Sequence, residues 1–107
     1  MKQINAYIHH CRSTNVLDAL QKAGYKNVAL LDVKGTLKPL NETELAFTSE
    51  ARVVISEVLI VLFCKVHQVE KVTQIIRENA YIGNNTSGWI YVAPVEQTIE
   101  IKRPPKP

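Results

Sequence analysis

The sequence has few cysteines and no long apolar run. Its two cysteines, Cys11 and Cys64, do not form a CxxC pair and are too few for a disulfide framework. The longest apolar run, near residues 58–64, is much shorter than the roughly 18 residues that a membrane span needs. The first ten residues lack an apolar stretch long enough for a signal peptide. We therefore expect a cytoplasmic protein with reduced thiols.

The motifs of several enzyme classes are also missing. The chain contains no GxGxxG fingerprint, no Walker loop and no nucleophile elbow. Two nearby carboxylates, Glu42 and Glu44, lie in a segment with the composition of a loop, where we expect them to be solvated. The sequence therefore predicts a protein that is not an enzyme.

Positive charge is in small excess, and it is concentrated at one end of the chain. Thirteen Lys and Arg against ten Asp and Glu give a net charge of +3. Lys102, Arg103 and Lys106 supply much of this excess. A basic tail differs from the basic stripe that tracks a phosphate backbone, so we do not expect nucleic acid as a partner.

The chain has the length and the apolar content of one α+β domain. Its 107 residues are 46% hydrophobic, which suits a single core and excludes disorder. Alternating and aliphatic runs predict strands, and apolar residues at helical spacing predict two helices. The first helix would be capped at its start by Ser13, Thr14 or Asn15 and would end at Gly24. We expect strands at 3–9, 27–33, 53–64, 89–95 and 97–101, with helices at 13–23 and 67–80.

This order, β-α-β followed by β-α-β, predicts a ferredoxin-like sandwich. Both helices would cover one face of the sheet, and the third strand would be buried on both faces in its second half. The other sheet face would be left bare, so we expect self-association. The domain is expected at 1–103 with a flexible tail at 104–107. Between the two halves, 36–52 has no period and contains Pro39 and Asn41, which predicts a long functional loop.

Several segments resemble the PII nitrogen-regulatory signalling proteins. The resemblance rests on MKQINAYI at the start, on VLDALQKAGYKNVALLDVKG with Asp32 to Gly35 at its end, on Thr43-Glu44-Leu45, on GWIYV from Gly88, and on PVEQTIEI from Pro94. It implies a ferredoxin-like homotrimer that binds adenine nucleotides between subunits. It also implies that the long loop, called the T-loop, docks on an enzyme, a transcription factor or a membrane transporter.

The resemblance also implies two sets of functional residues. The nucleotide cleft, for ADP, AMP or ATP, would be framed by Gly35, Thr36, Leu37, Gly83, Gly88, Trp89, Lys102 and Arg103. The partner-binding part of the loop would contain Glu42, Thr43, Glu44, Leu45 and Phe47.

At several positions the sequence departs from the family pattern. Ala51 stands where uridylylated members have a tyrosine, and Trp89 stands where the phosphate loop has a lysine. Pro39 replaces the glutamine that binds magnesium and 2-oxoglutarate, and Glu57 replaces the lysine that pairs with an oxoglutarate carboxylate. Because two carboxylates repel each other, we do not expect 2-oxoglutarate as a ligand.

Two alternative functions remain open at this point. Three features are similar to a divergent PII-like branch found beside heavy-metal efflux transporter genes: GWIYV, the short loop KGTLKPL and the cysteine that ends the third strand. A metal-responsive trimer would use imidazole and thiolate ligands from His9, His10, Cys11 and His67. A trimer without any ligand would instead regulate a transporter by docking alone.

Overall fold

The structure, a computed structural model, describes residues 1–35 and 55–105. The strands in these two segments are β1 (Lys2–His9), β2 (Val28–Gly35), β3 (Ile55–Cys64) and β4 (Gly88–Pro94). The α-helices are α1 (Ser13–Lys22) and α3 (Val69–Ala80), and each follows a short 3₁₀ turn, η1 (His10–Arg12) or η2 (Val66–Gln68). The predicted helices and the first four predicted strands are thus confirmed to within a few residues.

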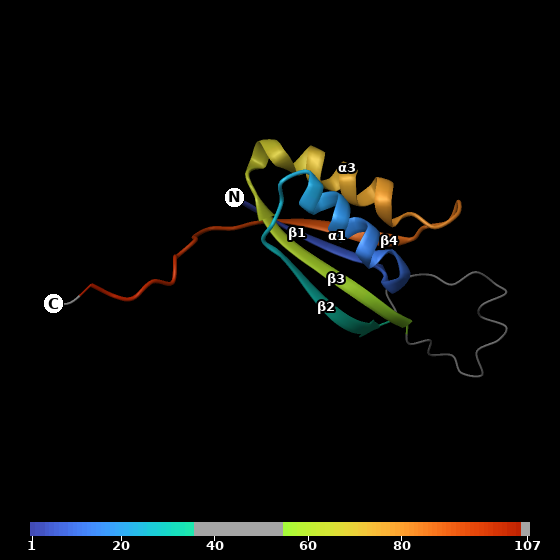
Figure 1. Cartoon of the computed structure of the whole chain (residues 1–107), viewed down its shortest axis with the longest axis horizontal. Coiled ribbons are helices and arrows are strands. Elements are labelled where there is room, and N and C mark those ends of the chain that lie inside the picture. Colours follow the sequence, from blue (N-terminus) through green and yellow to red (C-terminus); the bar gives the residue numbers. More distant parts are fainter. Residues whose placement is uncertain (36–54, 106–107) are drawn as a thin grey trace.

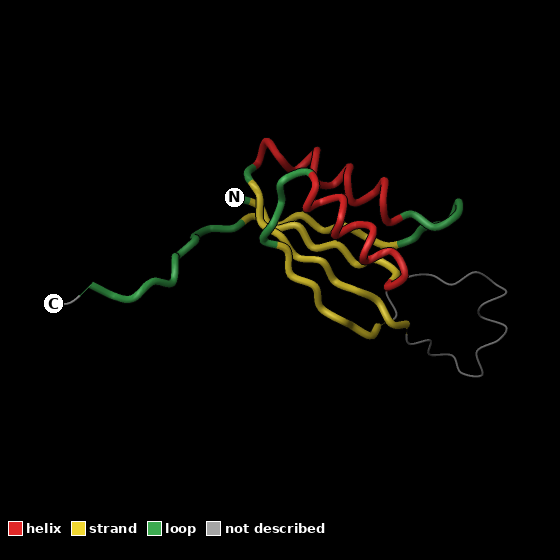
Figure 2. The backbone as a smooth tube through the Cα atoms, in the orientation of Figure 1, coloured by secondary structure: helices red, strands yellow, loops and turns green. Residues whose placement is uncertain are grey.

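The strands form one antiparallel sheet in the order β2-β3-β1-β4. Both helices lie side by side on one face of this sheet (Figures 1 and 2). This is the ferredoxin-like arrangement that the element order predicts. The register places His9 beside Glu57, so the ends of β1 and β2 and the starts of β3 and β4 meet at one end of the sheet.

The core lies between the sheet and the two helices. Alternate residues of β1 and β3 point toward the helices because side chains in a strand alternate between faces. Residues from α1 and α3 meet them at the spacing of one helical face. The side chains of this core that are at most 2% exposed are those of Ile4, Ala6, Ile8, Val16, Leu20, Ile60, Leu62, Val72 and Ile76.

None of the described residues covers the opposite face of the sheet, which carries large apolar side chains, and this confirms the predicted bare face. We call it the open face. Tyr7 and Tyr91 form an edge-to-face ring pair there, with ring centroids 5.9 Å apart. The prediction that β3 is buried on both sides in its second half is wrong for the single chain, since Phe63 on the open face is 55% exposed. In the part of the chain that the structure describes, only the helix-facing row of β3 has a covering layer.

The predicted start of the first helix is wrong in detail. Arg12 occupies the N-cap position of α1 and makes no capping side-chain bond. The preceding turn η1 is capped instead by His9, whose Nδ1 accepts a hydrogen bond from the Cys11 N–H at 3.3 Å. Ser13 Oγ donates to the His10 carbonyl at 2.8 Å rather than accepting from the helix. The helix ends before Gly24 as predicted, and this glycine has a φ of +97°.

The predicted strand at 97–101 is also wrong for the single chain. After β4, Val95 N–H donates to the Met1 carbonyl at 3.1 Å, and then the chain extends away from the sheet as an irregular segment (Figure 1). Ile99 is 74% and Ile101 98% exposed. The alternation predicted a strand, but no neighbouring strand of the same chain lies beside this segment in the described residues.

Among the described residues, neither α1 nor α3 combines the length and the apolar character that a helix needs to cross a membrane.

Candidate functional site

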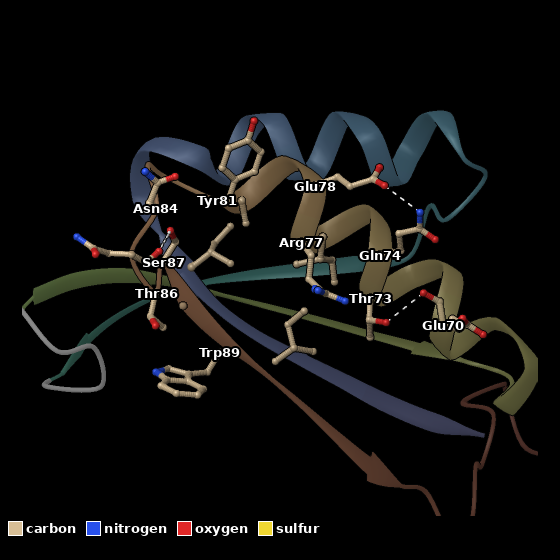
Figure 3. A pocket seen from close by; sticks show the side chains of 16 residues that line it. Glu70, Thr73, Gln74, Arg77, Glu78, Tyr81, Asn84, Thr86, Ser87 and Trp89 are labelled. Atoms are coloured by element: carbon tan, nitrogen blue, oxygen red, sulfur yellow. Dashed lines mark hydrogen bonds between the residues drawn. The ribbon is translucent and has the colours of Figure 1, made fainter.

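A cavity of about 940 Å³ lies at one end of the fold, between α3, the turn that follows it and the start of β4. Figure 3 shows the side chains that line it, including Arg77, Tyr81, Ser87 and Trp89. Its volume is in the range of sites that hold small molecules or cofactors, which is roughly 300–1,000 Å³. It is partly open to solvent, and more than half of its lining residues have polar side chains.

The turn 82–87 is held closed by one hydroxyl group. Ser87 Oγ accepts a hydrogen bond from the Ile82 N–H at 2.7 Å. The same oxygen lies 3.2 Å from the Ile82 carbonyl and 3.1 Å from the Asn85 carbonyl, either of which can accept its proton. Gly83 has a φ of +59°, in the left-handed region that glycine adopts without cost. The turn therefore presents its backbone to the cavity in a fixed shape.

Gly88 and Trp89 connect this turn to the sheet. Gly88 packs against the Tyr7 backbone, and a Cβ atom at this position would collide with the Tyr7 carbonyl oxygen. The next two residues alternate, so Trp89 lies on the open face while Ile90 packs against the core. Trp89 is 45% exposed. Its indole is therefore available both to a ligand ring and to a second protein chain.

The cavity contains a single cation among the lining residues that the structure describes. Arg77 extends from α3 toward β4 between the turn and Thr73 (Figure 3). The acidic residues of the lining are Glu70 and Glu78. Glu78 Oε1 accepts a hydrogen bond from Gln74 Nε2 at 2.9 Å, which holds this carboxylate along the outside of the helix.

Arg77 is not among the residues that the sequence predicts for the site. Glu70, Thr73, Arg77 and Tyr81 are spaced at three or four residues and share one stripe of a helix. This polar stripe, followed directly by the turn 82–87 with its glycine, is the sequence pattern from which Arg77 could have been predicted. The predicted amphipathic pattern drew attention only to the apolar stripe of α3.

Of the predicted cleft residues, the chain brings only some together. Gly88 and Trp89 line the cavity, and Gly83 lies in its turn. Gly35 ends β2 at the other edge of the sheet, three strand spacings or about 14 Å from β4. Thr36 and Leu37 lie outside the described residues. So do the predicted partner-binding residues Glu42, Thr43, Glu44, Leu45 and Phe47, as well as Pro39 and Ala51.

Lys102 and Arg103 lie on the segment that leaves the fold at the opposite end of the sheet from the turn (Figure 1). Lys102 Nζ is 3.0 Å from Glu100 Oε1, and both side chains are at least 70% exposed. An exposed pair of this kind contributes little to stability because water screens it. Within one chain these cations do not reach the cavity.

The predicted metal ligands are divided between the two ends of the sheet. His9, His10 and Cys11 follow one another at the end of β1, where the two imidazole rings stack with centroids 4.7 Å apart. His67 lies in η2, beyond the end of β3. Because β1 and β3 are antiparallel, the two places are separated by the strand length of about 25 Å. Across residues 1–35 and 55–105, no three His, Cys, Asp or Glu side chains are grouped to hold a metal ion.

The chain matches known proteins over almost its whole length. The family model described as nitrogen regulatory protein P-II matches residues 1–104. The chain is 32% identical over 104 residues to the nitrogen regulatory protein P-II of Cereibacter sphaeroides, covering 95% of this chain and 92% of that protein. It is 30% identical over 103 residues to the protein of that name from Azospirillum brasilense, with the same coverage. It is 26% identical over 104 residues to the nitrogen fixation nifHD region GlnB-like protein 1 of Methanobacterium ivanovii, covering 95% and 94%.

Proposed function

This chain belongs to the nitrogen regulatory protein P-II family, and from that premise we propose that it is a signal-transduction regulator built as a homotrimer. Proteins of this family are regulators rather than enzymes. In the proposal, an adenine nucleotide (ADP, AMP or ATP) binds in the clefts between subunits. Nucleotide binding then controls a partner protein through the loop 36–52.

The open face supports the trimer. Tyr7, Leu31 and Trp89 lie in one row across this face, and Leu31 and Trp89 are each almost half exposed. An apolar surface of this kind on a small domain usually serves as an interface. A closed ring of identical chains covers three such faces at once without leaving any of them in water.

The observation that carries the proposal of an intersubunit cleft is the distribution of the cleft residues. Gly88 lies at one edge of the sheet, Gly35 lies at the other edge, and Lys102 projects from the opposite end. One chain does not assemble them around a single ligand. A neighbouring copy can bring its own Gly35 edge or its own Lys102 next to this chain's turn 82–87.

The cavity supports an adenine nucleotide as the ligand. The turn 82–87 offers backbone N–H groups, which bind phosphate oxygens in many proteins. Tyr81 and Trp89 supply aromatic rings on opposite sides of the turn, with Trp89 on the open face, and an adenine ring can stack on either of them. Glu57, which is only 5% exposed, lies at the same end of the sheet. A carboxylate there repels a dicarboxylate, so 2-oxoglutarate is not part of the proposal.

The loop 36–52 would transmit the signal, with a membrane transporter as one class of partner. A ligand changes the conformation of a loop only if it binds one loop state more tightly than the other. Gly35 joins this loop to β2 and is one of the predicted cleft residues. A nucleotide that contacts Gly35 is therefore placed to favour one loop state.

Calorimetric titration of ADP into the assembled protein, with and without magnesium, tests this function. We expect binding in the micromolar range at about one nucleotide per subunit. Lys102→Ala should weaken it about tenfold, since a charge-assisted phosphate contact is lost. Lys22→Ala, which removes an exposed cation from α1, is the matched control and should bind like the wild type. No heat with ADP, AMP or ATP would contradict the nucleotide proposal.

A further inference from the structure

The phosphates of a nucleotide in this cavity need a cation, and the sequence offers none in the turn itself. Residues 82–87 contain no Lys or Arg, and the residue after Gly88 is a tryptophan that lies on the open face. Lys102 leaves the fold at the opposite end of the sheet, so within one chain it does not reach the cavity. Within one chain, positive charge must therefore come to the cavity from another element.

Arg77 is the residue placed to supply it. It lies in the last turn of α3, three residues before the helix ends at Ala80, and the turn 82–87 follows directly. Its side chain lines the cavity, and in Figure 3 it extends from α3 beside Thr73. Arg77 is exposed, so its guanidinium can reorient toward a bound anion without breaking core contacts.

The acidic neighbours of Arg77 do not neutralise it. Glu78 is held by Gln74 at 2.9 Å. Glu70 lies seven residues earlier, which is about 10 Å along the helix axis. No ion pair joins Arg77 to a carboxylate among the residues that the structure describes. Its fork of N–H donors is thus free to bind phosphate oxygens.

We propose that Arg77 is the cation by which the chain that forms the cavity pairs with the phosphates of the nucleotide, in addition to the Lys102 of a neighbouring copy, so that this chain recognises phosphate from α3 rather than from the residue after Gly88. The inference rests on the proposed nucleotide function and names the group that provides its charge. The guanidinium is suited to this role because it binds two oxygens of one phosphate at the same time.

Titrations of adenosine, AMP and ADP into wild-type protein, Arg77→Ala, Arg77→Lys and Lys71→Ala test the inference. Lys71 is an exposed cation on the same helix that does not line the cavity, so Lys71→Ala is the matched control. Arg77→Ala should weaken ADP about tenfold or more and AMP by less, and it should leave adenosine unchanged. Arg77→Lys should recover part of the ADP affinity, because it restores the charge without the fork.

The outcomes separate the two levels of the proposal. If wild-type protein binds ADP and Arg77→Ala binds it as well as Lys71→Ala does, the role of Arg77 is overturned and the nucleotide function stands. If Arg77→Ala weakens adenosine as much as ADP, its effect is on the shape of the cavity, and the inference is likewise overturned. If wild-type protein binds no nucleotide, both proposals fail. Far-UV circular dichroism of each variant excludes loss of the helix as the cause.

Discussion

Gly88 packs so closely against the Tyr7 carbonyl that the start of β4 has no room for a Cβ atom. Gly88 pairs with Ile8 in the sheet register, and the turn 82–87 enters the sheet directly before it. The fold therefore requires glycine at position 88 whether or not a ligand binds. This glycine lets the backbone of the turn approach β1 and so fixes the position of the cavity relative to the sheet.

Gly88→Ala should therefore destabilise the fold. The new methyl group would overlap a backbone carbonyl that is held in the ladder, and forced overpacking of this kind costs about 1–3 kcal/mol. Urea unfolding followed by circular dichroism measures the change. Gly83→Asn is the control, since no atom lies within 4 Å of a Cβ there and asparagine accepts a positive φ. Equal stability of Gly88→Ala and wild type would contradict this packing account.

Arg12 ties the two helices together near the cavity. Its Nε–H donates to the Asn79 carbonyl at 3.0 Å, and Asn79 Nδ2 donates in turn to the Ile75 carbonyl at 2.8 Å. We expect Arg12→Ala to lower the free energy of unfolding by about 1–2 kcal/mol, because a charge-assisted bond to a helix end is lost at a partly exposed site. Hydrogen exchange at the end of α3 should also accelerate.

The control for this bond is Lys22→Ala, which removes an exposed cation from the same helix and should change stability by less than about 0.5 kcal/mol. An Arg12→Ala variant that is as stable as Lys22→Ala would show that the Arg12 bond contributes nothing in solution.

The free energy of unfolding should depend on pH in the alkaline range because of Cys64. Burial raises the pKa of the Cys64 thiol above its ordinary value of 9.0, and the positive N-terminus opposes this shift only in part. In the unfolded chain the thiol ionises near its ordinary pKa, whereas in the folded chain it stays protonated to higher pH. The unfolded state then binds fewer protons, so the free energy of unfolding falls as the pH rises above about 9.

Urea unfolding between about pH 7.5 and pH 10 compares wild type with Cys64→Ala. The wild type should lose stability more steeply with pH than the variant does. Cys64→Ala lowers stability at every pH by creating a cavity, so the slope is the informative quantity. Cys11→Ser, which alters the exposed thiol, should keep the wild-type slope. Parallel curves for wild type and Cys64→Ala would rule out the linkage.

Assembly should depend on the open face. Leu31→Asp places a charge in the row that contains Tyr7 and Trp89, and burying an unpaired carboxylate at an interface costs several kcal/mol. We expect size-exclusion chromatography with light scattering to give a trimer for wild type and monomers for Leu31→Asp. Thr14→Asp, which adds the same charge to an exposed position of α1, should remain a trimer. A trimeric Leu31→Asp variant would mean that another surface forms the assembly.

The sequence predicted the fold well because the folding information is local and periodic. The alternation of apolar residues in β1 and their helical spacing in α3 can each be recognised within a single element, because one side of that element faces the core and the other faces solvent. Two of the three errors in the predicted fold concern features that depend on a neighbour. The last strand needs an edge, and the second face of β3 needs a covering layer, and the described residues of one chain provide neither.

The candidate site was predicted less completely. Gly88 and Trp89 were found through resemblance, and both line the cavity. Arg77 was missed because an exposed arginine on a polar helix face carries no distinct signal until the turn is folded against it. The predicted metal ligands are not brought together in the described residues. His9 ends β1 and His67 follows the end of β3, and because these strands are antiparallel the two histidines lie at opposite ends of the sheet. Residue types alone do not reveal this separation.

The most direct test of the central claim is native mass spectrometry of the protein with ADP. We expect trimers that carry up to three nucleotides, and Leu31→Asp monomers that carry none, because each cleft needs residues from two chains. Nucleotide bound to the monomeric variant with wild-type affinity would contradict a site between subunits. Wild-type trimers that stay free of nucleotide at saturating ADP would contradict the sensing function itself.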